Sequence, residues 1–353
     1  MFKDVYKVVG VMSGTSLDGV DCAYIQLSLS PDGNWDYNFL KTTTFEYDHQ
    51  WQDRLRDCSL LEVGEVKQLE DDFTQHLIDI LREFIGQLNG RPDAICSHGH
   101  TVWHRPELGY TRQIGDGQVL ATALQLPVVC DFRTQDVALG GQGAPLVPIG
   151  DRLLFHDYEY CLNLGGFANC SMENDGQRLA YDICPVNIVL NRYAQKLGYP
   201  YDDKGRLAAS GNVNESLLTR LNNLAYYQLS PPKSLGVEWV SEQIDPILVE
   251  TDLPHCDMLR TLVEHMAEQI AGSIPVKSKV LITGGGAYND FLIRRIREEC
   301  EAEITIPQAN LIEHKEALIF GLLGVLRFRN EVNCLASVTG AKKNHSSGKI
   351  FHP

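Results

Sequence analysis

The first third of the chain alternates between short apolar segments and stretches with helical spacing. Apolar positions around a polar turn near the N-terminus predict a β-hairpin, and further apolar runs follow it. Strands are predicted at residues 8–11, 22–27, 38–47, 93–96 and 127–133. Between 66 and 88 apolar residues recur every three or four positions with charged residues on the other face, and 118–126 is also predicted helical. The pattern therefore predicts a mixed α/β fold.

The second half repeats the opening pattern after the glycine cluster 140–145, which is the predicted domain junction. An apolar strand at 160–164, a Gly165-Gly166 turn and a returning strand at 167–172 form a second predicted hairpin. Further strands are predicted at 279–283 and 303–306, and helices at 185–197, 216–226, 257–274, 290–301 and 313–329. Each predicted domain thus begins with a glycine-tipped hairpin. Such a pair could bind a nucleotide from two sides, with one hairpin contributed by each domain.

Composition limits the possible partners. The chain has 353 residues, 44% of them hydrophobic, and a net charge of −15, with no basic run beyond Lys342-Lys343. No nucleic-acid partner is therefore expected. The ten cysteines are scattered without metal-site or disulfide-like spacing, and the longest apolar run, 317–326, is too short to cross a bilayer. These features predict a cytoplasmic protein with no membrane association.

The tip of the first hairpin carries more polar residues than a turn needs. Hydroxyl groups, glycines and carboxylates gather there, at Ser13, Gly14, Thr15, Ser16, Asp18, Gly19 and Asp21. Glycines let backbone N–H groups approach an anion, and an acid can hold hydrated Mg²⁺ beside phosphate oxygens. The segment is thus a candidate phosphate loop, although it lacks the Gly-Lys-Ser/Thr of a Walker A loop. An ordinary surface turn is an equally good interpretation at this point.

A second glycine-rich segment follows the predicted strand 279–283. Gly284, Gly285 and Gly286 precede Asn289, which is a good N-cap for the next helix. Such a turn lets a flat ligand lie against bare backbone. An ordinary β-to-α turn is about as good an interpretation.

Three histidines, His98, His100 and His104, follow the predicted strand 93–96. His98 and His100 alternate along one face and could be two zinc ligands, but no cysteine or acid stands beside them at zinc spacing. Lining a ligand cleft, or stabilising the loop by hydrogen bonds, is the preferred interpretation.

The order of hairpin, second hairpin and Gly-Gly-Gly-Ala resembles the superfamily of sugar kinases, actin and heat-shock chaperones. Longer motifs resemble the anhydro-N-acetylmuramic acid kinases of bacterial cell-wall recycling: Met-Ser-Gly-Thr-Ser-Leu-Asp-Gly-Val-Asp, Ser-His-Gly-His-Thr-Val-Trp-His-Arg-Pro, Asp-Phe-Arg-Thr-Gln-Asp, Asn-Leu-Gly-Gly-Phe-Ala-Asn and Lys-Glu-Ala. The resemblance implies two actin-like, ribonuclease H-like domains, each a mixed β-sheet flanked by helices, with an ATP cleft between them. The first would cover 1–135 and the second 136–335, with a tail of about 336–353 packing back on the first.

The resemblance also implies the chemistry. An enzyme of this family uses ATP and Mg²⁺ to open a 1,6-anhydro sugar with water and to phosphorylate the released 6-oxygen. The implied base for the water is Asp182 in Tyr181-Asp182-Ile183-Cys184-Pro185-Val186-Asn187. Many family members have Asp-Thr-Gly-Pro-Gly-Asn here, so Ile183, Cys184 and Val186 depart from the pattern. An acid near a helix start is the structural alternative for Asp182.

The remaining roles carry over by motif. Nucleotide and phosphate binding is implied for Gly10, Ser13, Gly14, Thr15, Ser16, Asp18, Gly165, Gly166, Gly284, Gly285 and Gly286, with Asp18 holding Mg²⁺ through water. Sugar binding is implied for Thr101, Arg133 and Glu316. Arg133 could hold the lactyl carboxylate with two parallel hydrogen bonds, and its structural alternative is a surface ion pair with Asp136.

Three functions remain open from the sequence. The first is the kinase for the muramic sugar, and the second is a kinase for another 1,6-anhydro sugar such as levoglucosan. The third is a non-catalytic nucleotide-binding protein of the same fold, suggested by the altered loop after Asp182. The resemblance suggests a homodimer.

Overall fold

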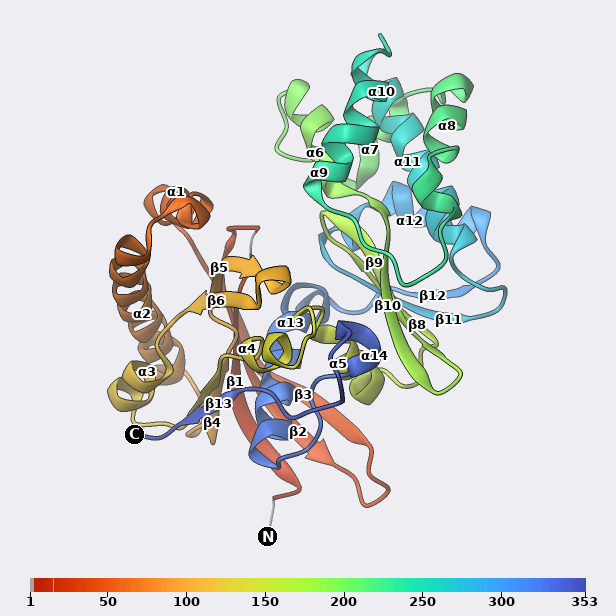
Figure 1. Cartoon of the computed structure of the whole chain (residues 1–353). Helices are drawn as coiled ribbons and strands as arrows, with labels where there is room; N and C mark the ends of the chain where they lie inside the picture. Colours follow the sequence, from red (N-terminus) through yellow and green to blue (C-terminus); the bar gives the residue numbers. More distant parts are fainter. Residues whose placement is uncertain (1–2, 15) are drawn as a thin grey trace. The chain divides into compact units, whose positions relative to one another are not determined.

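The structure is a computed structural model that describes residues 3–14 and 16–353. Contacts within the chain divide it into two compact units (Figure 1). The first unit consists of residues 1–154 and 314–353, and the second of residues 155–313. Within the described residues, no helix is both long and apolar enough to cross a membrane.

The first unit is built on a six-stranded mixed sheet in the order β13-β7-β4-β1-β2-β3. β1, β2 and β3 form an antiparallel meander, β4 and β7 continue the sheet parallel to β1, and β13 adds an antiparallel edge. The strands are β1 Val5–Ser13, β2 Gly19–Leu29, β3 Trp35–Glu46, β4 Ala94–Ser97, β7 Val128–Cys130 and β13 Lys349–Phe351. The end of the chain thus completes the sheet that the beginning starts.

Helices and a small hairpin complete this unit. The hairpin is β5 His100–Arg105 and β6 Tyr110–Ile114, with the turn η2 Pro106–Leu108 between its strands. The helices are α1 His49–Arg56, η1 Cys58–Leu60, α2 Val63–Gly86, α3 Gly117–Leu124, α4 Thr134–Ala138, α5 Val147–Leu154 and α14 Ala336–Thr339. The helix predicted over residues 66–88 is confirmed, and its apolar face lies in the core with Val9 and Val11 of β1.

The opposite side of β1 meets α13 Ala309–Phe328 at very close range. A Cβ atom on Gly10 would lie 1.9 Å from the carbonyl oxygen of Ala317, and one on Gly324 would lie 2.1 Å from Sγ of Cys96. Glycine at both positions lets the helix backbone approach the sheet. Gly10, which the sequence grouped with the phosphate-binding residues, therefore has a packing role that accounts for it.

The second unit has a five-stranded sheet in the order β10-β9-β8-β11-β12. β8, β9 and β10 form an antiparallel meander, and β11 and β12 run parallel to β8. The strands are β8 Tyr160–Leu164, β9 Phe167–Asn174, β10 Gln177–Pro185, β11 Lys279–Thr283 and β12 Glu303–Thr305. The first sheet has the same arrangement, with three antiparallel strands joined by hairpins and two further strands parallel to the first of them. The predicted α/β fold with two mixed sheets is confirmed.

Helices flank this sheet as well. They are α6 Asn187–Lys196, η3 Asp203–Gly205, α7 Arg206–Ser210, α8 Glu215–Asn222, η4 Ala225–Gln228, α9 Val237–Trp239, the π-helical turn η5 Val240–Ile244, α10 Asp245–Val249, α11 His255–Gly272, η6 Gly285–Tyr288 and α12 Asp290–Glu299. Helix α11 lies at the centre and contacts α6, α7, α8, α12 and β10 (Figure 1). The predicted N-cap is confirmed, because Oδ1 of Asn289 accepts from the backbone N–H of Leu292 at 3.0 Å.

The unit boundaries differ from the residue ranges expected from the glycine cluster. Residues 136–154 and 314–335 belong with the first sheet. The cluster itself is tied to this unit, since N–H of Gly141 donates to the carbonyl of Asp136 at 2.9 Å and N–H of Gln142 to that of Thr339 at 2.7 Å. The second boundary coincides with a non-helical residue inside α13, His314, with φ −115° and ψ 19°.

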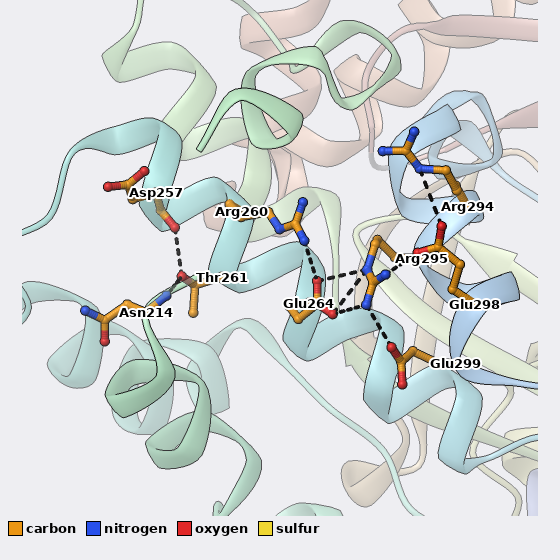
Figure 2. Close-up of polar contacts among 9 residues, drawn as sticks. All are labelled: Asn214, Asp257, Arg260, Thr261, Glu264, Arg294, Arg295, Glu298 and Glu299. Carbon is orange, nitrogen blue, oxygen red and sulfur yellow. Dashed lines mark hydrogen bonds and ion pairs between the residues drawn. The ribbon is translucent and has the colours of Figure 1, made fainter. Parts of the chain in front are cut away.

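An ion-pair network joins α11 to α12 in the second unit (Figure 2). Glu264 of α11 is 7% exposed and accepts hydrogen bonds at 3.0 and 3.1 Å from Nε of Arg295, and Arg260 lies 3.4 Å away. Arg295 also pairs with Glu298 and, at 2.8 Å, with Glu299. Because a buried carboxylate without a cation is costly, Arg295 is the residue on which this helix contact depends.

Replacing Arg295 with Met should therefore destabilise the second unit by about 2–3 kcal/mol, because Glu264 stays buried with a single, more distant arginine. Arg294→Met is the matched control. Its pair with Glu298 spans 4.0 Å and is exposed, so the expected loss is below about 1 kcal/mol. Urea unfolding of both variants measures the difference, and equal losses would contradict the assigned importance of Arg295.

Candidate active site

The tip of the β1–β2 hairpin carries residues predicted to bind phosphate. Gly14 is half-buried, while Ser16 and Asp18 are exposed. Thr15, predicted with them, lies outside the described residues. The side chain of Asp18 makes no hydrogen bond or ion pair to any residue that the structure describes. The tip thus presents a hydroxyl group and a carboxylate to solvent.

Ser13 is placed differently from its neighbours at the tip. It is buried, and its Oγ lies 2.7 Å from the hydroxyl of Tyr47 and 2.9 Å from Nδ1 of His100. Burial lowers the pKa of His100 to about 4, so this ring is neutral at pH 7. The hydroxyl of Ser13 therefore anchors the base of the tip to β5.

A second carboxylate near the tip is already held by the protein. Oδ1 of Asp21 accepts a hydrogen bond from Oγ1 of Thr44 at 2.6 Å and lies 3.7 Å from Nδ1 of His314. Mg²⁺ prefers oxygen ligands and usually keeps several waters. The exposed, unbonded carboxylate of Asp18 fits such a hydrated ion better than Asp21 does.

Arg133, between β7 and α4, is positioned by two acceptors. Its Nε donates to Nε2 of His98 at 2.9 Å, and its Nη1 donates to the carbonyl of Gly143 at 2.7 Å. The predicted alternative, a surface ion pair with Asp136, is wrong, because Asp136 is buried and accepts from Thr339 at 2.7 Å instead. Nη2 of Arg133 has no partner among the described residues, so it remains free to donate to a ligand.

The hydrogen bonds of His98 define its protonation. Its Nδ1 lies 2.9 Å from the carbonyl of Gly99, which can only accept, so Nδ1 carries the proton. Nε2 must then be the acceptor for Arg133. Burial first, and the charge of Arg133 second, hold the pKa of His98 well below its usual value. With both nitrogens in use, His98 is not available as the zinc ligand considered from the sequence.

Thr101 belongs to a chain of hydrogen bonds along the β5–β6 hairpin. Nε2 of Gln113 donates to Oγ1 of Thr101 at 3.3 Å and to Oγ1 of Thr111 at 2.9 Å. Oγ1 of Thr111 in turn lies 3.1 Å from Nδ1 of His104. Gln113 stands in no motif, so no sequence pattern predicted these hydrogen bonds.

Glu316 lies on α13, one residue before the close contact with β1. Its carboxyl group is accessible, yet surrounding protein raises its pKa, while Arg133 and Lys315 partly oppose that shift. Lys315 itself forms a buried ion pair with Asp151 of α5 at 2.8 Å. The charge of Arg133 therefore acts on the carboxyl group of Glu316 within the first unit. These are two of the three residues predicted to bind sugar.

A separate cavity of about 480 Å³ lies in the first unit beside β6 and β7. His98, Asp116, Asp131, Thr134 and Lys349 are among its lining residues. Neither Arg133, Glu316 nor the hairpin tip lines it. The residues predicted to bind sugar and phosphate in the first unit therefore lie outside this cavity.

In the second unit, a row of polar residues crosses the sheet at one level. Asp182 of β10 pairs with Asn169 of β9, Asn169 with Asn163 of β8, and Asn163 with Thr283 of β11. Laterally paired residues project from the same face of a sheet. β8, β10 and β11 run in the same direction, so their carboxyl ends, where this row lies, share one edge.

Asp182 is held by a loop far away in the sequence. The backbone N–H of Leu235 donates to its Oδ2 at 2.8 Å, its own N–H donates to the carbonyl of Lys233 at 3.0 Å, and the hydroxyl of Tyr226 donates to its carbonyl at 2.7 Å. Oδ1 has no partner among the described residues. Partial burial raises the pKa of Asp182, and the Leu235 hydrogen bond opposes this. One carboxylate oxygen is thus fixed while the other is free.

The residues that depart from the family pattern are core residues. Ile183, Cys184 and Val186 are each at most 2% exposed and pack in the core of the second unit. The pairing of β10 with β9 shifts at this point, between Asp182 and Cys184. Burial raises the pKa of the Cys184 thiol, so this cysteine is not a reactive thiolate.

The two glycine turns of the second unit lie together at the carboxyl end of β8. Backbone N–H groups of Val186 and Asn187 donate to the carbonyls of Gly166 and Gly165, at 2.8 and 3.3 Å. Gly284 has φ +82°, and a Cβ atom there would lie 2.5 Å from Oδ1 of Asn163.

The other two glycines of the 284–286 turn differ from each other. A Cβ on Gly286 would lie 2.7 Å from Cβ of Leu164, whereas at Gly285 it would meet open space. Gly286 is therefore needed for packing against β8, and Gly285 leaves bare backbone accessible at the same edge as Asp182.

Comparison with known families gives a match over nearly the whole chain. The sequence model of a family described as anhydro-N-acetylmuramic acid kinase matches residues 6–353. An anhydro-N-acetylmuramic acid kinase of Vibrio cholerae is 34% identical over 374 aligned positions, covering 98% of each chain. One of Bacillus cereus is 30% identical over 381 positions, covering 98% of this chain and 99% of the relative.

Similarity to solved structures is weaker. The activator of the 2-hydroxyisocaproyl-CoA dehydratase from Clostridium difficile, with bound ADPNP, is 13% identical, with a TM-score of 0.43 over 90% of this chain and 94% of that chain. The family relationship therefore depends on the sequence matches.

The hydrogen bonds of His98 lead to a spectroscopic expectation. Nitrogen-15 NMR of the ring, assigned by comparison with His98→Gln, should show Nδ1 protonated, Nε2 unprotonated and no titration near the ordinary histidine value of about 6.5. Protonation would require loss of the Arg133 hydrogen bond, since a protonated Nε2 cannot accept it. Titration of His98 near that ordinary value would contradict the assigned tautomer.

Proposed function

Since the chain belongs to the anhydro-N-acetylmuramic acid kinase family, we propose that it is an ATP-dependent sugar kinase of peptidoglycan recycling. Its substrate is anhydro-N-acetylmuramic acid and its product N-acetylmuramic acid 6-phosphate. The observation that carries this proposal is the environment of Asp182, whose one free carboxylate oxygen lies at the edge where the two glycine turns of the second unit meet.

The chemistry follows from the substrate. Its 6-oxygen is bonded to the anomeric carbon, so there is no free 6-hydroxyl to phosphorylate. Water adds to the anomeric carbon, the bond from that carbon to the 6-oxygen breaks, and the 6-oxygen takes the γ-phosphoryl group of ATP. The balanced products are the sugar 6-phosphate, ADP and one proton released from the water.

Asp182 is the proposed base that takes this proton. The N–H of Leu235 holds Oδ2, which orients the carboxylate and leaves Oδ1 to face the water. Partial burial raises its pKa and so increases its basicity, while the same hydrogen bond opposes that rise by favouring the carboxylate form. A positioned base of this kind contributes about 10²- to 10⁴-fold to the rate.

Arg133, Glu316 and Thr101 are the proposed sugar-binding residues. His98 and Gly143 fix the guanidinium of Arg133 and leave Nη2 to donate to the lactyl carboxylate of the muramic sugar. The accessible carboxyl of Glu316 suits a hydroxyl or amide group of the same ligand. This carboxylate recognition is what favours the muramic sugar over levoglucosan, which has no acid group.

The nucleotide is assigned to both hairpins and to the glycine turn. Gly14, Thr15 and Ser16 would contact the β- and γ-phosphates, as would Gly165 and Gly166 of the second unit, and Gly284, Gly285 and Gly286 the adenosine. Mg²⁺, when bound, neutralises phosphate charge, and the exposed carboxylate of Asp18 would hold it through water. We further propose a cytoplasmic location, since the cytoplasm supplies ATP and keeps the ten cysteines reduced. The family resemblance is the basis for also proposing a homodimer.

ADP release by the purified protein with ATP and Mg²⁺ tests the function. The muramic anhydro sugar should stimulate release, whereas levoglucosan and the absence of sugar should not. Asp182→Asn should lower kcat by about 10²-fold or more, because the amide cannot take the proton, and should leave ATP binding intact.

Other outcomes would change the assignment. Equal stimulation by levoglucosan would show that the acid group is not recognised and would favour a kinase for another anhydro sugar. ATP binding without stimulation by any anhydro sugar would favour the non-catalytic nucleotide-binding protein. Full activity of Asp182→Asn would remove Asp182 as the base.

Arg133→Lys tests recognition of the lactyl carboxylate. Lysine keeps the charge but loses the planar pair of donors and the hydrogen bond to His98. The KM for the muramic sugar should rise by about 10- to 100-fold, as expected for losing a charge-assisted hydrogen bond, while the KM for ATP should not change. Steady-state kinetics with each substrate varied in turn measures both, and equal effects on the two constants would contradict this role.

A further inference from the structure

A buried cluster in the first unit takes no part in the proposed reaction. Asp136 of α4, Cys334 and His345 are 0%, 1% and 6% exposed. One ligand atom from each lies within 4.8 Å of those of the other two, and among the described residues no other group of three has this arrangement. Carboxylate, thiolate and imidazole together are ligands typical of Zn²⁺.

His345 directs an unpartnered nitrogen at this cluster. Its Nδ1 lies 3.1 Å from the carbonyl of Lys343, and since a carbonyl only accepts, Nδ1 carries the proton. In the neutral ring Nε2 holds a lone pair; it has no hydrogen-bond partner among the described residues and lies 3.6 Å from Oδ1 of Asp136. Two lone pairs that face each other in a buried site repel, and a cation between them removes the repulsion. A ring N–H bound to a backbone carbonyl is also the usual support for a metal-ligating histidine.

The spacing of the three ligand atoms suits a tetrahedral ion. Sγ of Cys334 lies 3.1 Å from Oδ1 of Asp136, and Nε2 of His345 lies 3.6 Å from the same oxygen. Zinc bonds of about 2.0–2.3 Å place tetrahedral ligands about 3.3–3.6 Å apart. Both distances from Oδ1 lie within a few tenths of an ångström of these values, and all three ligand atoms lie within 4.8 Å of one another.

The backbone holds the ligands in place before any ion binds. Cys334 and His345 form an isolated antiparallel bridge, with N–H to carbonyl distances of 3.1 and 3.2 Å. Oδ2 of Asp136 accepts from the N–H of Gly143 at 2.7 Å, which leaves Oδ1 directed at the other two ligands. A Cβ on Gly141 would lie 2.2 Å from Oδ2 of Asp136, so only glycine leaves room for this carboxylate.

We propose that Asp136, Cys334 and His345 bind one Zn²⁺ ion that joins α4 to the C-terminal segment. On binding, the thiol of Cys334 gives its proton to solvent and its sulfur becomes a ligand. Oγ1 of Thr339, 2.7 Å from Oδ1 of Asp136, or a water completes the coordination. The ion stabilises the loop that carries Arg133, three residues before Asp136, and acts as a structural centre.

Metal analysis of the purified full chain after zinc loading and dialysis tests the site. The wild type should retain about one Zn²⁺ per chain and unfold at a higher temperature with zinc than after chelation. Cys334→Ser and His345→Gln should each weaken binding at least about 10-fold. Cys300→Ser and His352→Gln are the matched controls, because neither residue belongs to the cluster, and both should bind like the wild type.

Cobalt substitution in the wild type keeps the test decisive if a variant folds poorly. Co²⁺ at the site should give thiolate-to-metal charge-transfer absorption in the near ultraviolet and the d–d bands of a tetrahedral ion. No retained metal and no such absorption would overturn the proposal. Retention that is unchanged in Cys334→Ser and His345→Gln would overturn it too, as adventitious binding elsewhere.

Discussion

Close approach between helix and strand backbones is the constraint on which the first unit depends. Helix α13 comes so near to β1 and β4 that a methyl group on Gly10 or Gly324 would overlap its neighbours. Because the helix is fixed at this distance, Lys315 and Glu316, which follow its non-helical residue His314, are fixed relative to the sheet as well. The buried pair of Lys315 with Asp151 adds α5 to the same assembly. Gly10, which the family resemblance assigned to phosphate binding, thus helps to position Glu316 by letting α13 pack closely on β1.

The same principle applies to the second unit on a smaller scale. Gly284 and Gly286 allow the turn after β11 to pack directly against the end of β8. That contact brings both glycine turns to the edge where Asp182 lies. The bulky residues after Asp182, Ile183 and Val186, fill the core below this edge. Their departure from the family pattern is therefore compensated by packing, while the carboxylate of Asp182 keeps a free oxygen.

Sequence patterns predicted the elements whose signal is local. Helical spacing identified α2, apolar runs with polar turns identified both hairpins, and Asn289 was recognisable as an N-cap. The same patterns placed the domain junction at 140–145, because glycine density marks a turn equally well inside a unit and between units. One contact that holds this segment in the first unit, from Gln142 to Thr339, joins residues nearly two hundred positions apart. No local signal reports such contacts.

In the candidate site, too, the functional residues were predictable from motifs, whereas the distant residues that orient them were not. The family resemblance indicated Asp182 and Arg133, but not the groups that orient them. The N–H of Leu235 lies 53 positions from Asp182, and the ring of His98 lies 35 from Arg133. His98 in particular was considered as a metal ligand because histidines at alternate positions suggest one. Its two hydrogen bonds show why it is instead a fixed acceptor: Nδ1 donates to the carbonyl of Gly99 and the lone pair of Nε2 accepts from Arg133, so no lone pair is left for an ion.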